Sequence, residues 1–185
     1  MRALALVAHP DDCVIFAWPF IEAHPEFAWT IMYMTYTQSS PRGTELNNYW
    51  KKRNITTVFL GFNDDWEFVK NGELGFNAEQ ANREMVNIGN HYDLILTHFE
   101  DGDYGHIHHK FVNTAAKQID KPKVYFASTF NYNTQYVVQE SVDVGELPIH
   151  KEVIEQFQDR NIGRYIITPE AELLLKNKNE NINIK

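Results

Sequence analysis

Residues 3–12 read ALALVAHPDD, and the prediction of the fold starts from this stretch. Ala3 to Ala8 form a short continuous apolar run, which is typical of a strand that is covered on both faces. Four polar or turn-forming residues follow at once: His9, Pro10, Asp11 and Asp12. Pro10 stiffens the turn, and aspartates suit the start of a helix because carboxylates complement its cap and dipole. The stretch therefore predicts a strand, a sharp turn and a helix.

The same alternation of short buried runs and longer amphipathic stretches continues along the chain. Further apolar runs predict strands at residues 29–35, 57–60, 93–97 and 123–127. Helix-like stretches lie at 12–23, 44–54, 78–90 and 106–119. Strands that alternate with helices of about 10–14 residues indicate βαβ units and a parallel sheet. The region 132–164 is less regular, and we expect a strand at 136–138 and a helix at 150–157.

Length and composition predict one compact domain. The chain has 185 residues, of which 43% are hydrophobic and 14% aromatic, so it can bury a sizeable core. It shows no linker and no internal repeat. We therefore expect a single α/β domain over residues 1–175, with no second domain. The last ten residues, 176–185 (KNKNENINIK), predict a polar C-terminal tail that frays.

Charge and cysteine content exclude several classes of function. A formal net charge of −8 repels phosphate backbones, so we expect no nucleic-acid partner. The single cysteine, Cys13, rules out an intramolecular disulfide framework. A thiolate at a helix start can be reactive, but no base is assigned to Cys13, so we expect a small buried core residue. The first apolar run is too short for a signal-peptide core or a membrane span. We expect a cytoplasmic protein without a stable membrane anchor. The sequence leaves open whether the protein forms a homo-oligomer.

Two loops carry most of the residues that can bind a metal. In open parallel sheets, ligands bind beyond the carboxyl ends of the strands. His9 to Asp12 follow the first predicted strand, and His98 to His109 follow the fourth. His106 and His109 are three residues apart, so a helix presents them on one face. If both strands are central, the two loops meet at one rim of the sheet.

Imidazole and carboxylate together favour Zn²⁺, and a catalytic zinc site has three protein ligands and an open position. His9, Asp12 and His109 supply such a set. Asp11 and His106 then remain as a base that takes a proton from water and an acid for the departing amine, which are the parts needed to hydrolyse an amide. Each cluster alone has a simpler explanation, a capped helix start or solvated histidines, but two such clusters at strand ends favour a site.

These residues resemble the LmbE-like/PIG-L family of zinc-dependent N-acetylglucosaminyl deacetylases. The family signature (P/A)HPDD matches residues 8–12, and its HPDH signature matches residues 106–109, which read HIHH. The resemblance implies an α/β fold, a Rossmann-like three-layer sandwich with a mostly parallel central sheet. It also implies roles for individual residues. These are metal ligation by His9, Asp12 and His109, general base catalysis by Asp11, stabilisation of the oxyanion or protonation of the amine by His106, and contact with the tetrahedral intermediate by Tyr104.

Weaker matches extend the resemblance to about residue 127. Arg42 to Glu45 fit an R-x-x-E element, and Leu60 to Asp64 fit a Leu-Gly pair followed by an aspartate. From these matches we expect substrate binding by Arg42 and Asp64, and also by His108, which stands where the family has an acid. Several neighbours have plainer expectations. Asp103 belongs to a solvated acidic loop, Trp66 to the core or a sugar-stacking surface, and His98 to the core or the pocket wall.

The sequence thus predicts a zinc-dependent amidohydrolase that removes an acetyl or other acyl group from an amino-sugar conjugate. Another divalent transition metal remains open as the cofactor. Two alternatives stay in view. One is a catalytically impaired LmbE-like protein that only binds a metal or a sugar, because His108 replaces the acid. The other is a nucleotide-binding domain, which the absence of a G-x-G-x-x-G stretch after the first strand disfavours.

Overall fold

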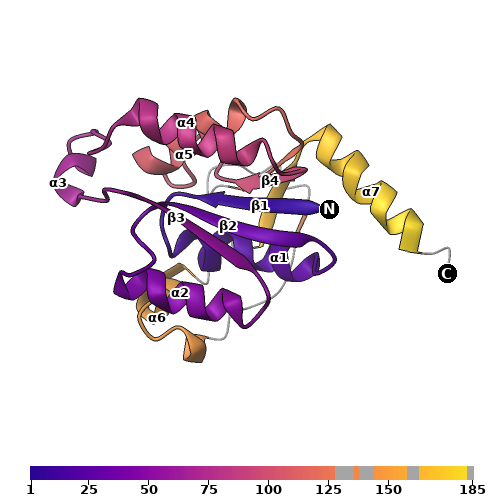
Figure 1. Ribbon diagram of the computed structural model, residues 1–185, viewed down its shortest axis with the longest axis horizontal. Coiled ribbons are helices and arrows are strands. Elements are labelled where there is room, and N and C mark those ends of the chain that lie inside the picture. The colour runs from indigo at the N-terminus through magenta and orange to yellow at the C-terminus, as the bar shows by residue number, and fades with distance from the viewer. Residues whose placement is uncertain (128–135, 138–143, 158–162, 183–185) are drawn as a thin grey trace.

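The computed structural model describes residues 1–127, 136–137, 144–157 and 163–182 (Figure 1). Within these residues, seven strands form one sheet in the order β3-β2-β1-β4-β5-β7-β6. The strands are β1 (Arg2–Val7), β2 (Ala28–Thr35), β3 (Thr56–Phe62), β4 (Leu94–Thr97), β5 (Lys123–Phe126), β6 (Tyr136–Val137) and β7 (Arg164–Ile167). The first five are parallel to one another, and β7 pairs antiparallel with both β5 and β6.

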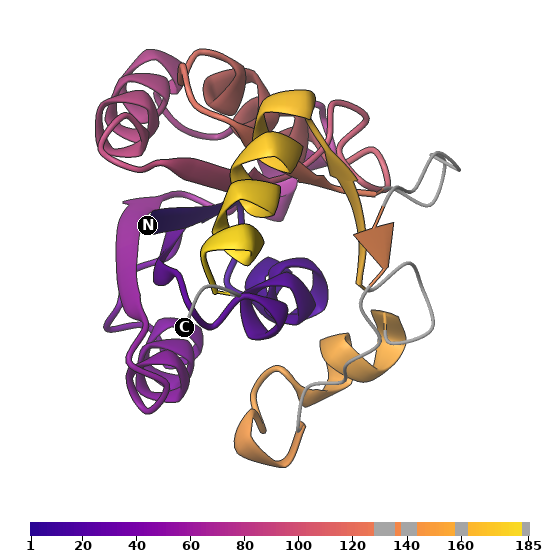
Figure 2. The ribbon, with the colours of Figure 1, turned by 90° about the vertical axis from the view of Figure 1, so that its right-hand side faces the viewer.

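Helices cover both faces of the sheet and make three layers (Figures 1 and 2). Helices α4 (Ala78–Gly89) and α5 (Ile107–Lys117) pack on one face. On the other face lie the π-helix η1 (Cys13–Ala17), α1 (Trp18–Ala23), α2 (Pro41–Lys51), α6 (Lys151–Phe157) and α7 (Pro169–Ile182). The short elements α3 (Trp66–Val69) and η2 (Val144–Glu146) complete the described elements.

Strand β1 shows why an uninterrupted apolar run is needed at the centre. Its successive side chains point to opposite faces of the sheet, as in any strand. Ala3, Ala5 and Val7 pack into the core beneath α1 and α2, whereas Leu4 and Leu6 pack into the core beneath α4 and α5. All five side chains are fully buried. The predicted three-layer α/β sandwich with a mostly parallel sheet is therefore confirmed.

The predicted elements occur in the predicted order, with four additions. The predicted helix at 12–23 is a π-helix followed by α1, and the expected strand at 136–138 is β6, with residue 138 outside the described residues. The sequence pattern does not predict strand β7, helices α3 and α7, or the short 3-10 helix η2. Helix α7 continues to Ile182, so part of the predicted polar tail at 176–185 is helical, and residues 183–185 lie outside the described residues. Among the described residues, no helix has the length and hydrophobicity that crossing a membrane requires.

The strand order places the two metal-competent loops side by side. The chain runs from β1 to β2 to β3 along one side, and then returns to place β4 on the other side of β1. This reversal between β1 and β4 is where ligands bind in open α/β sheets. Leu6 of β1 is paired with Thr97 of β4, so both strands end at the same rim. His9 leaves one strand there, and His98 leaves the other.

Cys13 is a structural residue of the core, as expected. Its Sγ lies 2.9 Å from the Tyr33 hydroxyl and 3.1 Å from the Pro10 carbonyl oxygen, and the indole of Trp50 donates to it at 3.3 Å. Burial raises the pKa of the Cys13 thiol well above its ordinary value. The thiolate is the reactive form of cysteine. We therefore expect Cys13 to be inert in the folded protein.

Thiol titration with dithiobis(nitrobenzoate) measures this directly. The native protein should show no reaction on the time scale in which the same protein in guanidinium reacts fully. Rapid labelling without denaturant, with the circular dichroism of the fold unchanged, would contradict the assignment of Cys13 to the core.

Candidate functional site

The structure brings together the three predicted metal ligands. The Nδ1 atom of His9 lies 3.2 Å from Nε2 of His109. Asp12 lies between them, with one carboxylate oxygen 3.3 Å from His9 Nδ1 and the other 3.3 Å from His109 Nε2. His9 comes from the turn after β1 and His109 from the first turn of α5, one hundred residues later. All three side chains are buried.

The turn after β1 aims Asp12 at these imidazoles instead of at the helix. Although Asp12 precedes η1, its carboxylate makes no capping bond to that helix. It accepts a hydrogen bond of 2.7 Å from the backbone N–H of His9. Burial raises the pKa of Asp12, but the imidazoles of His109 and His98 outweigh this and hold it well below its usual range. Asp12 is therefore a carboxylate at neutral pH.

Asp103 holds the ring of His109 from behind. Its Oδ2 lies 2.8 Å from Nδ1 of His109 and 2.5 Å from Nδ1 of His98. A carboxylate can only accept, so Nδ1 of His109 carries the proton and its Nε2 lone pair faces His9 and Asp12. The ring of His98 thus binds the same carboxylate oxygen as His109. Its other nitrogen, Nε2, accepts a hydrogen bond of 3.0 Å from the backbone N–H of Ala8. This is the arrangement in which histidines bind metals, with the second ring nitrogen donating to a carboxylate.

The expectation that Asp103 belongs to a solvated loop is wrong. Its exposed fraction is only 2%, and its carboxylate lies against the rings of His98 and His109. Asp103 has φ = 65°, and Gly102 and Gly105 flank it with positive φ as well. Aspartate and glycine tolerate this left-handed region better than other residues do. The pattern G-D-x-G beside a histidine-rich helix start is the signal that marks this tight loop in the sequence.

Asp11 presents a carboxylate at the edge of this cluster. Its Oδ1 is buried and accepts no hydrogen bond from the described residues, while Nη1 of Arg42 lies 3.8 Å away. Burial, followed by the charge of Asp12, raises the pKa of Asp11 above its usual value. A buried acceptor without a hydrogen bond is costly, so this oxygen is suited to a donor that is not part of the protein.

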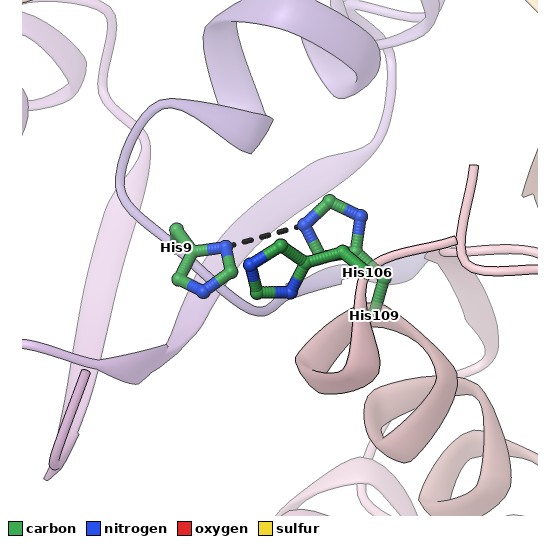
Figure 3. A group of neighbouring side chains, drawn as sticks. All are labelled: His9, His106 and His109. Carbon is green, nitrogen blue, oxygen red and sulfur yellow. Dashed lines mark hydrogen bonds between the residues drawn. The ribbon is translucent and has the colours of Figure 1, made fainter. Parts of the chain in front are cut away.

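His106 lies against both predicted histidine ligands (Figure 3). Its ring centroid is 4.7 Å from that of His9 and 4.8 Å from that of His109. His106 caps α5, because its Nδ1 accepts the backbone N–H of His108 at 3.2 Å. The Nε2 atom therefore carries the proton of the neutral ring. Burial, together with the neighbouring His109 and His9, lowers the pKa of His106 to about 3.

Tyr104 lies at the exposed edge of the histidine cluster. Its side chain is 44% exposed, and its ring centroid is 5.1 Å from His109 and 5.9 Å from His106. Burial of the phenol, with the nearby Asp12, raises the pKa of Tyr104 above its ordinary value. The phenol is therefore neutral and can donate a hydrogen bond.

Asp64 and His108 lie on the other side of His9. Asp64 Oδ1 is 3.5 Å from His9 Nε2 and 3.6 Å from His108 Nδ1. The His108 ring is fully buried, with one nitrogen 3.0 Å from His9 and the other 2.9 Å from the Leu74 carbonyl oxygen. Both of its ring nitrogens thus have partners within the protein, which does not favour the predicted substrate contact of His108. Trp66 is 68% exposed on α3, so it is not a core residue.

Among the described residues, three groups of side chains bring metal-ligand atoms within 4.8 Å of one another. They are His9 with His106 and His109, His9 with Asp64 and His108, and Asp12 with His98 and His109. Every group contains His9 or His109. Burial lowers the pKa of His9, but Asp12 and Asp64 outweigh it and raise the value to about 10. The carboxylates of Asp12 and Asp64 therefore stabilise a positive charge at His9.

Known proteins are similar to this chain over most of its length. The chain is 25% identical over 152 residues to an uncharacterized protein of Acanthamoeba polyphaga mimivirus, covering 72% of this chain and 63% of that relative. The chain thus spans less than two thirds of that relative's length.

Two solved structures share the fold at low sequence identity. A conserved protein of Thermus thermophilus superposes with a TM-score of 0.63 at 11% identity, covering 91% of this chain and 94% of that one. An N,N'-diacetylchitobiose deacetylase of Pyrococcus horikoshii superposes with a TM-score of 0.55 at 13% identity, covering 91% and 84%. At such identities the likeness shows the fold alone.

A family model identifies the chain more specifically. The model described as PIG-L, GlcNAc-PI de-N-acetylase, matches residues 4–119. The match covers well over half of the chain, and it includes both signatures, AHPDD at 8–12 and HIHH at 106–109. The resemblance seen in the sequence is therefore confirmed, and the chain belongs to the PIG-L family.

Proposed function

We propose that the protein is a metal-dependent hydrolase that removes an acetyl or other acyl group from an N-acylated amino sugar or its conjugate, with Zn²⁺ as the metal. The observation that carries the proposal is the spacing of the three donors of His9, Asp12 and His109. A tetrahedral ion with bonds of about 2.0 Å needs donors about 3.3 Å apart. The two imidazole nitrogens are 3.2 Å apart, and each is 3.3 Å from the Asp12 carboxylate, His9 from its Oδ2 and His109 from its Oδ1.

The chemistry of the donors supports the same assignment. Two imidazoles and one ionised carboxylate form a set that Zn²⁺ and related transition metals favour. A divalent ion held there would polarise the amide carbonyl and make a nearby water more acidic. Four carboxylates surround the histidines, those of Asp11, Asp12, Asp64 and Asp103. In the described part of the chain, Arg42 is the one arginine or lysine that forms an ion pair with any of these carboxylates.

The remaining residues of the site have roles that follow from their positions. Asp11, with its buried free oxygen, takes the proton of the attacking water. His106 directs its Nε2 proton at the negative oxygen that develops on the carbonyl, or at the departing amine, and Tyr104 donates to the same region. Removing one donor of this kind from a hydrolase typically lowers turnover by about 10²–10³-fold. Arg42 and Asp64 contact Asp11 and His9 respectively, and we assign the binding of sugar hydroxyls to them.

The family and the structural relative support the choice of substrate. The matching family model is described as a GlcNAc-PI de-N-acetylase, and the Pyrococcus horikoshii relative is named as a deacetylase of N,N'-diacetylchitobiose. Both descriptions involve an N-acetyl group on an amino sugar. We infer that this chain acts on the same kind of bond, and that its partner is a small molecule.

Assays on a panel of N-acylated glucosamine conjugates test this function. Release of acetate or a longer acid should require metal, stop with a chelator and return when Zn²⁺ is restored. A protein that holds zinc stoichiometrically and releases no acid from any member of the panel would instead be the impaired family member that His108 makes conceivable.

Asp103 provides a separate test of the metal assignment. In Asp103→Asn the acceptor for His109 and His98 loses its charge, which should lower the affinity for Zn²⁺ by about 10–100-fold. Competition against a chromogenic chelator measures the affinity. The matched control is Asp101→Asn in the same loop, which should bind Zn²⁺ like the unaltered protein. Unchanged affinity in Asp103→Asn would contradict the role of His109 as a ligand.

A further inference from the structure

We propose that His108 is a positioning residue that fixes the tautomer of His9, so that the Nδ1 lone pair of His9 faces the metal. This inference rests on the proposed function, because it assigns His9 to the metal. It also gives a role to the residue that departs from the HPDH signature of the family. The hydrogen bonds run from His9 through His108 to the carbonyl of Leu74, and we call these three residues the relay.

The direction of each hydrogen bond follows from the fixed end of the relay. The Leu74 carbonyl can only accept, so Nε2 of His108, 2.9 Å away, must donate to it. In the neutral ring of His108, Nδ1 is then an acceptor. It lies 3.0 Å from Nε2 of His9, which must therefore carry the His9 proton. The remaining nitrogen, Nδ1 of His9, faces Asp12 and His109, and it is the nitrogen that can give up its proton and bind a metal.

Distances decide between His108 and Asp64 as the partner of His9. Asp64 Oδ1 is 3.5 Å from His9 Nε2, which is beyond the usual range for an N–H···O hydrogen bond, whereas His108 Nδ1 is at hydrogen-bonding distance. The His108 ring is also held in place, because it is fully buried and packs against Phe76 with centroids 5.3 Å apart. The relay thus connects a metal ligand to the segment between α3 and α4.

The relay explains how the site tolerates a histidine where the family has an acid. A carboxylate at position 108 would accept the same proton from His9 Nε2. Histidine supplies an equivalent acceptor only while its other nitrogen donates to Leu74. The partner of a ligating histidine typically changes metal affinity by about 10–100-fold when it is removed.

Three substitutions at position 108 test the relay by metal affinity. Asparagine places its amide oxygen near the position of Nδ1 and can accept from His9, and aspartate can do the same. Leucine has similar bulk and cannot accept. We expect His108→Leu to weaken Zn²⁺ binding about 10–100-fold, and His108→Asn and His108→Asp to stay within about threefold of the unaltered protein. His91→Leu, at an exposed turn, is the matched control and should bind normally.

The order of the Zn²⁺ affinities distinguishes a positioning role of His108 from a packing role and from a role in binding a second metal ion. Equal losses in His108→Asn and His108→Leu would overturn the relay in favour of mere packing. Two zinc ions per chain, falling to one in Asp64→Asn, would overturn it in favour of a cation at His9, Asp64 and His108. Zinc binding in the expected order without hydrolysis of any acylated sugar would support the relay and contradict the proposed function.

A measurement on the unaltered protein does not depend on folding of the variants. Long-range ¹H–¹⁵N spectra of the zinc-loaded protein distinguish the two nitrogens of each imidazole. The relay predicts that His9 holds its proton on Nε2 and binds zinc through Nδ1. A spectrum in which Nε2 of His9 binds the metal would overturn it.

Discussion

Asp11→Asn should retain the metal and lose hydrolysis. The substitution preserves the shape of the side chain and removes the acceptor that takes the proton of water. General base catalysis contributes about 10²–10⁴-fold, so turnover should fall by that factor. Asp11 makes no hydrogen bond to His9, Asp12 or His109 among the described residues, so zinc affinity should change much less.

Single-turnover rates and zinc content, measured on the same preparation, check this prediction. Asp65→Asn is a suitable control, because Asp65 is a helix-capping aspartate at α3 that has no contact with the histidines of the described chain. If Asp11→Asn lost zinc in step with activity, Asp11 would be a ligand and the division of labour between the two neighbouring aspartates would be wrong.

His109→Ala should abolish both metal binding and hydrolysis. His109 supplies one of three donors, and its Nε2 is 3.2–3.3 Å from the other two. With two donors left, the site loses the three-ligand set that catalytic zinc requires. His106→Ala is the matched comparison, because it removes a neighbouring imidazole of the same cluster. It should keep zinc and lower turnover by about 10²–10³-fold.

Metal analysis after dialysis, with circular dichroism to confirm folding, distinguishes the two histidines. Zinc at one ion per chain in His106→Ala and near none in His109→Ala is the expected outcome. The reverse order would exchange the roles of the two residues.

The centre of the fold and the metal-competent cluster could be predicted because both are local in the sequence. The apolar run before His9 and the later run before His98 each identify a strand, and parallel strands end at a common rim. The spacing of His106 and His109 then predicts one helix face. The structure brings these residues within hydrogen-bonding distance or ring contact of one another.

Other features depend on contacts that a pattern does not show. Asp103 looks like part of an exposed acidic loop, and its burial results from a backbone turn at positive φ. His108 was expected to face a substrate, but its ring is buried against Phe76 and bonded to Leu74, a residue without any chemical signature. Strand β7 and helix α7 have no clear sequence pattern. Strand β7 is stabilised by pairing with β5, and helix α7 by packing on the core.

The most direct test of the central claim is a crystal structure of the zinc-loaded protein, with anomalous diffraction recorded at the zinc edge. The account predicts one strong peak per chain, bonded at about 2.0–2.2 Å to Nδ1 of His9, to Asp12 and to Nε2 of His109. A zinc peak located elsewhere in the chain, with these three side chains bonded only to one another, would contradict it.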